Sequence, residues 1–182
     1  MAMMLYYEIY FFSGYSRMAD INESVVVGWR EWLSLPEFGV VAIKAKIDTG
    51  ARTSAIHAFS IEPFEREGES WVRFGMHPNQ HESETEIWCV SKILEQRNVI
   101  DSGGHTEQRY VIKTDVTLGE STWAIEATLT NRDSMLFRML LGRTAMSSGN
   151  IIVDPALSYL ARQRNSTNIQ DPLKETLEGE TE

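Results

Sequence analysis

The sequence predicts an all-β domain, a small barrel or sandwich of short strands with one short helix. Three observations lead to this fold class. Short apolar or alternating segments follow one another through the middle of the chain, turn residues separate them, and only the stretch after Gly142 is typical of a helix. The chain has 182 residues, which predicts one domain with tails, and its hydrophobic fraction of 42% is enough for a core.

The expected strands are recognised by β-branched runs and by the alternation of apolar with polar side chains. The segment from Gly39 to Ile47 begins as an apolar run, becomes alternating and ends at Asp48. The segment from Tyr110 to Leu118 alternates until Gly119 breaks it. Strands are expected at residues 25–27, 39–47, 70–76, 86–90, 110–118, 122–129, 139–141 and 151–153, and the helix at 143–147.

The two ends of the chain differ from its middle and delimit an expected domain at residues 25–161. Residues 1–24 are expected to be a flexible N-terminal extension; residues 1–17 are interpreted as sequence upstream of the true start, or else as an edge strand or interface arm. Glu8 lies within the aromatic run, and no Lys or Arg precedes that run, which argues against a secretory signal. Residues 162–182 are polar and acidic and are expected to be a disordered tail.

Charge and cysteine content argue against several classes of protein. With 17 Lys and Arg against 26 Asp and Glu, the net charge is −9, which disfavours binding to nucleic acid or to an anionic membrane surface. No apolar stretch is long enough to span a bilayer, so no membrane partner is expected. Cys89 is the single cysteine, so no intramolecular disulfide can form, which predicts a reducing, cytoplasmic location.

The segment Asp48-Thr49-Gly50-Ala51 is the best candidate for chemistry. It follows an apolar strand, Gly50 permits a tight turn, and Ala51 is small enough for the loop to pack against a twin. Backbone N–H groups in such a loop can fix the orientation of the Asp48 carboxylate. The same tripeptide is also an ordinary turn, and only its context changes this interpretation. That context is Met139-Leu140-Leu141-Gly142-Arg143, bulky apolar residues before a glycine and the expected helix.

The order of these two elements resembles one lobe of a retropepsin-like aspartic peptidase. In that plan two carboxylates share one proton; one acts as general base on a water molecule while the other donates to the carbonyl oxygen of the substrate. The chain has one such lobe, so the resemblance implies a homodimer in which each chain supplies its Asp48. The alternative second half-site, Asp101-Ser102-Gly103, follows Asp48 too closely for a second lobe and shares with it the one apolar-apolar-Gly element downstream, so it is interpreted as a turn or flap-like tip.

The stretch from Val27 to Leu160 is similar to the ATP-dependent zinc protease family, a bacterial group of retropepsin-like proteins associated with ATP-grasp glutamate ligases. This resemblance implies a small closed acid-protease-like barrel with Asp48 as the catalytic residue and Thr49, Gly50 and Ala51 as its active-site loop. The blocks that carry it are Gly28-Trp29-Arg30-Glu31, Lys44-Ala45-Lys46-Ile47-Asp48-Thr49-Gly50-Ala51-Arg52-Thr53-Ser54-Ala55, Asp101-Ser102-Gly103-Gly104, Arg109-Tyr110-Val111-Ile112, Asn131-Arg132-Asp133 and Met139-Leu140-Leu141-Gly142-Arg143.

Two parts of the family's name find no counterpart in the residues. The sequence has no Gly-x-x-x-x-Gly-Lys-Ser/Thr loop for ATP and no His-Glu-x-x-His motif for zinc, so no cofactor and no metal ligand are predicted. His77 and His81 have a helical spacing, but Pro78 and Asn79 disfavour a helix there. Cys89, in an apolar strand, is interpreted as a packed thiol. The four histidines are interpreted as surface or loop residues: His57, His77, His81 and His105.

Arginines gather around the motif blocks although the chain is acidic. Arg52, Arg109 and Arg143 are assigned to substrate binding, because guanidinium groups bind carboxylates with two parallel hydrogen bonds. Arg132 and Arg138 are also among the arginines that gather around the motif blocks. For each arginine, a helix cap, a local ion pair or a solvated surface position is the alternative.

The function expected from this resemblance is hydrolysis of peptide bonds by an aspartic peptidase dimer. The associated glutamate ligases make a glutamate-rich peptide or tail the expected substrate. The alternative is a non-catalytic peptide-binding or assembly module on the same fold, in which the Asp48 loop is structural. The flap that covers the site is expected either at Ser60–Pro78 or at the 99–110 hairpin.

Overall fold

The computed structural model describes residues 24–80, 84–100, 104–132 and 135–163, and strands dominate these residues. The expected all-β fold class is confirmed. A 3-10 turn, η2 (Pro36–Phe38), and two short helices, α1 (Arg143–Ser148) and α2 (Leu160–Gln163), accompany the strands. The strands are β1 (Val25–Gly28), β2 (Arg30–Leu35), β3 (Val40–Ile47), β4 (Ser54–His57), β5 (Ser60–Arg66), β6 (Glu69–Met76), β7 (Ile87–Ile100), β8 (Thr106–Leu118), β9 (Ser121–Thr130), β10 (Met139–Leu141) and β11 (Ile151–Asp154).

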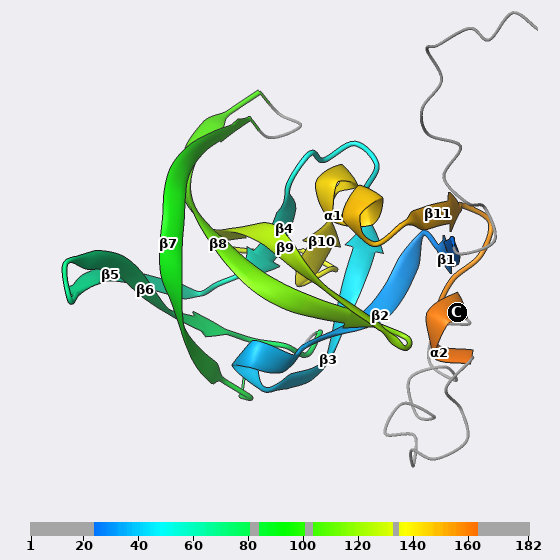
Figure 1. The fold of residues 1–182 in the computed structure, drawn as a ribbon, viewed down its shortest axis with the longest axis horizontal. Coiled ribbons are helices and arrows are strands. Elements are labelled where there is room, and N and C mark those ends of the chain that lie inside the picture. The colour runs from blue at the N-terminus through cyan, green and yellow to red at the C-terminus, as the bar shows by residue number, and fades with distance from the viewer. Residues whose placement is uncertain (1–23, 81–83, 101–103, 133–134, 164–182) are drawn as a thin grey trace, which may run out of the picture.

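Most of the strands belong to one sheet that closes on itself into a barrel (Figure 1). The order β2-β3-β10-β4-β9-β8 returns to β2, where Ser34 pairs with Thr117. Closure gives each of these strands a neighbour on both sides, which satisfies their backbone groups. The interior is filled by branched aliphatic side chains that are buried: Leu33, Ile43, Ile56, Ile112, Val116, Leu129 and Leu141.

Strand β10 is inserted between β3 and β4, which are consecutive along the chain. It runs parallel to β3, with Leu141 beside Ile47, and antiparallel to β4, with Met139 beside Ile56. Met139 and Leu141 are fully buried, so the apolar residues of the sequence motif anchor this strand in the core. The residue after β10 therefore arrives beside the residue after β3, which is Asp48.

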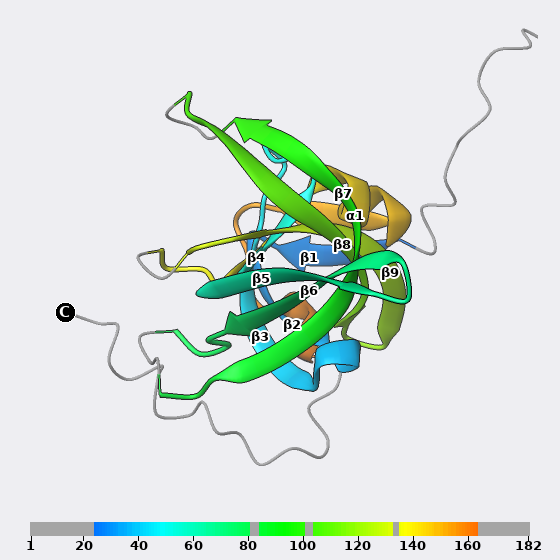
Figure 2. The same ribbon diagram turned by 90° about the vertical axis from the view of Figure 1, so that its left-hand side faces the viewer.

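Two hairpins extend from the barrel. The β5–β6 hairpin points away from α1, and β5 is the outermost strand of the sheet (Figure 1). The second hairpin is long, because β7 pairs with β6 through Lys92 and with β8 from Ile93 onward. In both views its outer end lies at the same end of the barrel as the β3–β4 loop and α1 (Figure 2). Which of the two expected segments forms the flap stays a prediction.

A buried carboxylate ties the start of the domain to its end. Glu31 is 0% exposed and accepts N–H bonds from Gly28 (2.7 Å), Leu160 (2.9 Å) and Ala161 (3.3 Å). Hydrogen bonds to an ionised acceptor are stronger than neutral ones, which offsets part of the cost of burying the charge. A Cβ at residue 28 would lie 2.3 Å from the Leu157 carbonyl oxygen, so glycine is needed where the two segments meet.

Every strand expected from the sequence is present, but β2, β4 and β5 were not predicted, and α2 is an additional helical turn. β2 buries Glu31 together with Leu33 and Leu35 and leaves Trp32 partly exposed, so a polar residue interrupts its apolar inward face at the start of the strand. β4 is short and buried at every position, including Ser54 and His57. β5 is largely exposed and contains Pro63, a residue typical of edge strands. The expected helix is α1.

The predicted N-terminal extension and most of the predicted tail lie outside the described residues, as do Asp101-Ser102-Gly103 and His81. Cys89 is 4% exposed, and its burial raises the pKa of the thiol to about 12, so the interpretation as a packed thiol is confirmed. Within the described part of the chain, no helix has both the length and the apolar character needed to cross a membrane.

Candidate active site

The Asp48 loop, residues 48–53, connects β3 to β4 and is fixed by the end of β10. The Asp48 N–H donates to the Leu141 carbonyl oxygen at 2.9 Å. The Gly142 N–H donates at 3.1 Å to the hydroxyl of Ser54, which is fully buried. The position of Asp48 therefore depends on a strand that is remote in sequence and adjacent in the sheet.

The Asp48 carboxylate is oriented by its own loop, as the sequence motif leads one to expect. Its Oδ1 atom accepts N–H bonds from Gly50 (3.0 Å) and Ala51 (3.3 Å). Its Oδ2 atom lies 3.6 Å from Lys46 Nζ, and the Asp48 side chain is 22% exposed. Thr49 and Gly50 are exposed as well. The carboxylate thus has a fixed direction and an accessible side, which are the geometric needs of a general acid or base.

Helix α1 binds the carbonyl groups of the same loop through its first residues. The Arg143 N–H donates to the Ala51 carbonyl oxygen (2.9 Å), and the Thr144 N–H donates to that of Arg52 (3.1 Å). The helix is held in turn by Trp123, whose Nε1–H donates to the Ala145 carbonyl oxygen at 3.0 Å. These bonds satisfy loop carbonyls that would otherwise need water.

The side chain of Arg143 also contacts the loop. Its Nη1 atom donates to the carbonyl oxygens of Thr49 (2.7 Å) and Gly50 (2.8 Å). In this chain the guanidinium therefore positions the loop that carries Asp48. Arg52 is exposed and contributes its carbonyl group to α1. The substrate-binding roles assigned to these two arginines from the sequence stay predictions.

The replacement Gly142→Ala is expected to lower the free energy of unfolding by about 1–3 kcal/mol, the range for overpacked sites. An added Cβ would lie 2.6 Å from the Thr53 carbonyl carbon and 2.9 Å from the Arg52 carbonyl oxygen, and backbone atoms cannot rotate away. Urea unfolding followed by circular dichroism measures the change. In the control Gly68→Ala, the new Cβ meets no atom within 4 Å, so only the φ of +76° is unfavourable. An equal or smaller loss for Gly142→Ala would contradict the close approach.

Arg97 connects the long hairpin to the Asp48 loop and was not recognised from the sequence. Its Nη1 atom donates to the Thr53 hydroxyl at 2.8 Å, and its Nη2 atom to the Glu126 carboxylate at 2.9 Å. Arg97 also pairs with Glu95 on its own strand. The hydrogen bond to Glu126 is the main cause that raises the pKa of Arg97, so the link stays charged at every ordinary pH.

Arg132 lies within electrostatic range of both Arg109 and Asp48, although the three residues belong to different blocks of the sequence. Burial, and next the charge of Arg109, lower the pKa of the Arg132 guanidinium, while the charge of Asp48 acts in the opposite direction. Arg109 Nε donates to the Glu107 carboxylate at 2.6 Å, and the Arg109 side chain is 14% exposed. Of the three arginines assigned to substrate binding, Arg109 is thus the one whose charge acts on Arg132.

The interpretation of all histidines as surface or loop residues is wrong for His57, which lies in β4, whereas His77 lies in the loop after β6 but is buried. His57 is 0% exposed and His77 is 7% exposed. His57 Nδ1 accepts the Arg132 backbone N–H at 3.1 Å, which assigns the His57 proton to Nε2, and this atom lies 3.3 Å from His77 Nδ1. Phe59 stacks on the His77 ring, with centroids 4.4 Å apart. Buried partners of this kind leave no periodic signal in one sequence, so the pair was missed.

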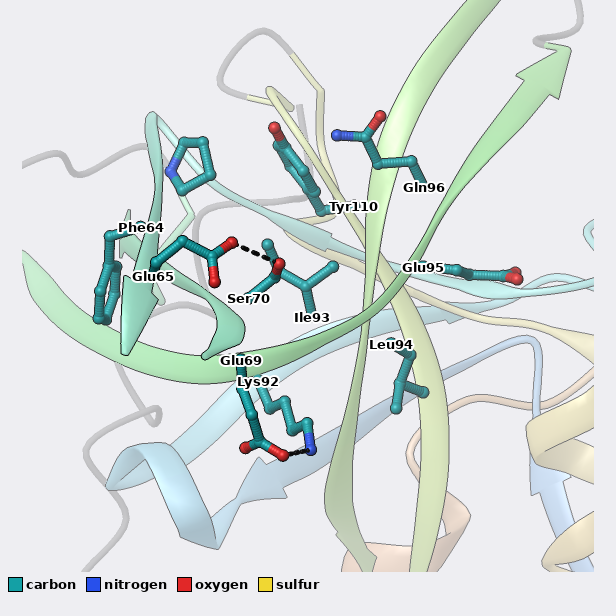
Figure 3. A pocket seen from close by; sticks show the side chains of 11 residues that line it. Phe64, Glu65, Glu69, Ser70, Lys92, Ile93, Leu94, Glu95, Gln96 and Tyr110 are labelled. Carbon is teal, nitrogen blue, oxygen red and sulfur yellow. Dashed lines mark hydrogen bonds and ion pairs between the residues drawn. The ribbon is translucent and has the colours of Figure 1, made fainter. Parts of the chain in front are cut away.

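No three His, Cys, Asp or Glu side chains of the described residues are grouped in a way that could hold a metal ion. A separate hollow of about 650 Å³ lies between the β5–β6 hairpin and β7–β8 (Figure 3). Its walls carry apolar residues such as Phe64 and Leu94 beside an ion pair of Lys92 with Glu69. No residue of the Asp48 loop lines this hollow.

The barrel, the inserted β10 strand, the braced Asp48 loop and the following helix define one lobe of a retropepsin-like aspartic peptidase. Comparison with known families agrees, because residues 26–164 match the model described as "RimB-like: Retropepsin-like aspartic endopeptidase RimB". The chain belongs to this family. The matched description names an aspartic endopeptidase, so the zinc protease label drawn from the sequence resemblance is not supported.

The curated relatives that the chain matches are much longer proteins, and their name refers to a ligase and not to an endopeptidase. It is 49% identical over 149 residues to the "Probable alpha-L-glutamate ligase" of Shewanella halifaxensis (strain HAW-EB4), covering 82% of this chain and 32% of the relative. It is 50% identical over 139 residues to the protein of the same name from Parasynechococcus marenigrum (strain WH8102), covering 76% and 30%. The chain thus spans about a third of the length of these relatives.

A solved structure has a similar fold. The crystal structure of Lpg0085, a protein of unknown function (DUF785) from Legionella pneumophila subsp. pneumophila str. Philadelphia 1, aligns with a TM-score of 0.64 and 27% identity. The alignment covers 75% of this chain and 97% of that chain.

Proposed function

We propose that this chain is an aspartic peptidase that hydrolyses peptide bonds as a homodimer, with Asp48 of each chain in one active site. The observation that carries the proposal is the Asp48 carboxylate, held by two loop N–H groups and left partly exposed, in a chain of the retropepsin-like family. In the dimer, one Asp48 carboxylate takes a proton from water, whose oxygen attacks the peptide carbonyl carbon. The other, protonated, donates its proton to the carbonyl oxygen. Collapse of the tetrahedral intermediate breaks the C–N bond: the leaving nitrogen takes the proton that the first Asp48 received from water, and the hydroxyl formed from the carbonyl oxygen returns its proton to the second Asp48.

Two features support a symmetric partner. The exposed residues Thr49 and Gly50 give the loop a free face on which a second loop can pack. Val26 and Ile152 are neighbours in the β1–β11 sheet and are 41% and 46% exposed, so apolar surface is available outside the barrel. A pair of carboxylates titrates as a unit, so activity in this proposal belongs to the dimer and not to one chain.

The proposed substrate is a peptide or protein tail rich in glutamate. The charges of Arg132 and Asp48 interact, and the charge of Arg109 acts on Arg132, so positive charge is available on this side of the site although the chain as a whole is acidic. The relatives that contain this region are named as probable α-L-glutamate ligases, and ligation of glutamate would produce tails of this kind. The flap in this proposal is the β7–β8 hairpin, which Arg97 links to the Asp48 loop.

The test is a peptidase assay on two peptides of equal length, one ending in an oligoglutamate tail and the other in an oligoglutamine tail. We expect cleavage of the glutamate peptide, detected by mass spectrometry, and little or none of the glutamine peptide. Sedimentation at the assay concentration should show a dimer. Equal cleavage of both peptides would contradict the substrate class, and activity from a strict monomer would contradict the shared site.

The relatives' names support one alternative, a non-catalytic module that binds a glutamate-rich tail for a ligase. It requires binding of the oligoglutamate peptide without cleavage at any pH. Measuring binding and cleavage on the same sample separates the two functions.

A further inference from the structure

Arg132 is held in place by contacts at its backbone and at the start of its guanidinium. Its backbone N–H donates to His57 Nδ1 (3.1 Å), and its carbonyl oxygen accepts a bond from Arg138 Nη1 (3.1 Å). Its Nε atom donates to the Phe137 carbonyl oxygen (3.0 Å), and the residue is 9% exposed. The direction of the side chain is therefore fixed before any ligand arrives.

A second chain of bonds brings Arg109 to the same place. Its Nε atom is bound by the Glu107 carboxylate, which also accepts the Thr130 hydroxyl at 3.2 Å. Thr130 ends β9, two positions before Arg132 in the sequence. The structure thus anchors two guanidinium groups separately and close enough for the charge of one to act on the other.

Neither arginine has its terminal nitrogens bound by another described residue. Among the side-chain nitrogens of Arg109 and Arg132, only the Nε atoms are hydrogen-bonded within the described part of the chain. No carboxylate in that part pairs with Arg132. Two like charges that are largely withdrawn from water disfavour each other unless an anion lies between them. Four Nη groups without a partner among the residues that the structure describes are suited to a carboxylate, which accepts two parallel bonds from one guanidinium.

We infer that Arg132, together with Arg109, forms a carboxylate-binding subsite beside Asp48 and selects an acidic side chain of the substrate. The inference rests on the proposed function and goes beyond it by naming the residue that reads the substrate. From the sequence, Arg132 was counted among the arginines around the motif blocks, but substrate binding was assigned to Arg52, Arg109 and Arg143 alone. Arg143 differs from Arg132, because its Nη1 atom is already used by the loop carbonyls.

The subsite is tested by equilibrium binding in the full chain carrying Asp48→Asn, so that cleavage cannot interfere. The probes are fluorescein-labelled oligoglutamate and oligoglutamine peptides of equal length. Arg132→Gln should weaken oligoglutamate binding about ten- to a hundredfold, the effect of losing hydrogen bonds to a charged group, and leave oligoglutamine binding unchanged. Arg132→Lys keeps the charge and loses the paired geometry, so it should fall between.

The matched control is Arg66→Gln, which removes an arginine from an exposed position on the β5–β6 hairpin and should change neither affinity. Thermal unfolding shows whether each variant is folded; if Arg132→Gln is not, the comparison of Arg132→Lys with the parent decides. Unchanged oligoglutamate affinity, or an equal loss for both peptides, would overturn the subsite. A different result is also informative. If the chain with Asp48 unchanged cleaves no peptide while binding still depends on Arg132, the proposed peptidase activity is overturned and the subsite is retained.

Discussion

The Asp48→Asn variant is expected to lose at least about 10³-fold in peptide hydrolysis, within the range that general acid–base groups contribute. In a homodimer one substitution removes both carboxylates, so neither the base that activates water nor the acid that protonates the carbonyl remains. The loop should keep its shape, because the side-chain oxygen of the introduced asparagine still accepts the N–H bonds that Gly50 and Ala51 now donate to Oδ1 of Asp48. Cleavage of the oligoglutamate peptide, followed by mass spectrometry, gives the rate.

The control for this experiment is Asp115→Asn in β8, which pairs with Ala124 of β9 and bonds Glu37 through its backbone N–H, and activity should be unchanged. The melting temperature and the sedimentation coefficient of Asp48→Asn should match those of the parent protein. Retained activity with an intact dimer would refute the proposed mechanism. A loss of activity that comes with loss of the dimer would mean that Asp48 is structural.

The second large effect is expected for Glu31→Gln, which should lower the free energy of unfolding by about 2–4 kcal/mol. The Glu31 carboxylate is fully buried and accepts bonds from three N–H groups, those of Gly28, Leu160 and Ala161. An amide places an NH₂ donor against one of these donors, so at least one bond is lost and two donors face each other. Differential scanning calorimetry should show a melting temperature roughly 5–15 °C lower.

The matched control is Glu120→Gln, which changes an exposed carboxylate in the turn after β8 and should shift the melting temperature by about a degree at most. The loss in Glu31→Gln should be accompanied by faster amide exchange at Ala161, because its N–H is the one bound to Oε2, whereas Oε1 accepts those of both Gly28 and Leu160. A stability equal to that of the control would show that water replaces the carboxylate without cost.

The fold class followed from the sequence because strand alternation and turn residues are local signals. Two of the strands that were missed, β2 and β4, bury a polar residue. Glu31 occupies an inward position of β2, and Ser54 and His57 are buried in β4. The hydrogen-bond partners of these buried polar residues are backbone groups and rings from other parts of the chain, so the sequence of β2 or β4 alone does not predict their burial.

The candidate site likewise contains residues whose role the sequence predicted and residues whose role it did not. Asp48 and its loop were predicted because the residues that orient the carboxylate, Gly50 and Ala51, are its immediate neighbours. The roles of Arg97 and Arg132 depend on contacts with Thr53 and His57, which only the closed barrel brings within reach. The residue types in the sequence indicated that arginines could bind the substrate, whereas the arrangement of the strands determines which arginine lies within electrostatic range of Asp48.

The insertion of β10 between β3 and β4 also fixes when the active-site loop can form during synthesis. Until Leu141 has left the ribosome, the Asp48 N–H lacks its acceptor, and β3 and β4 lack the strand that joins them. Contacts this distant in sequence form slowly, because a long loop of chain must close first. The β7–β8 and β8–β9 hairpins pair segments that are adjacent in sequence and can therefore form before the Asp48 loop, which needs a strand from near the end of the domain.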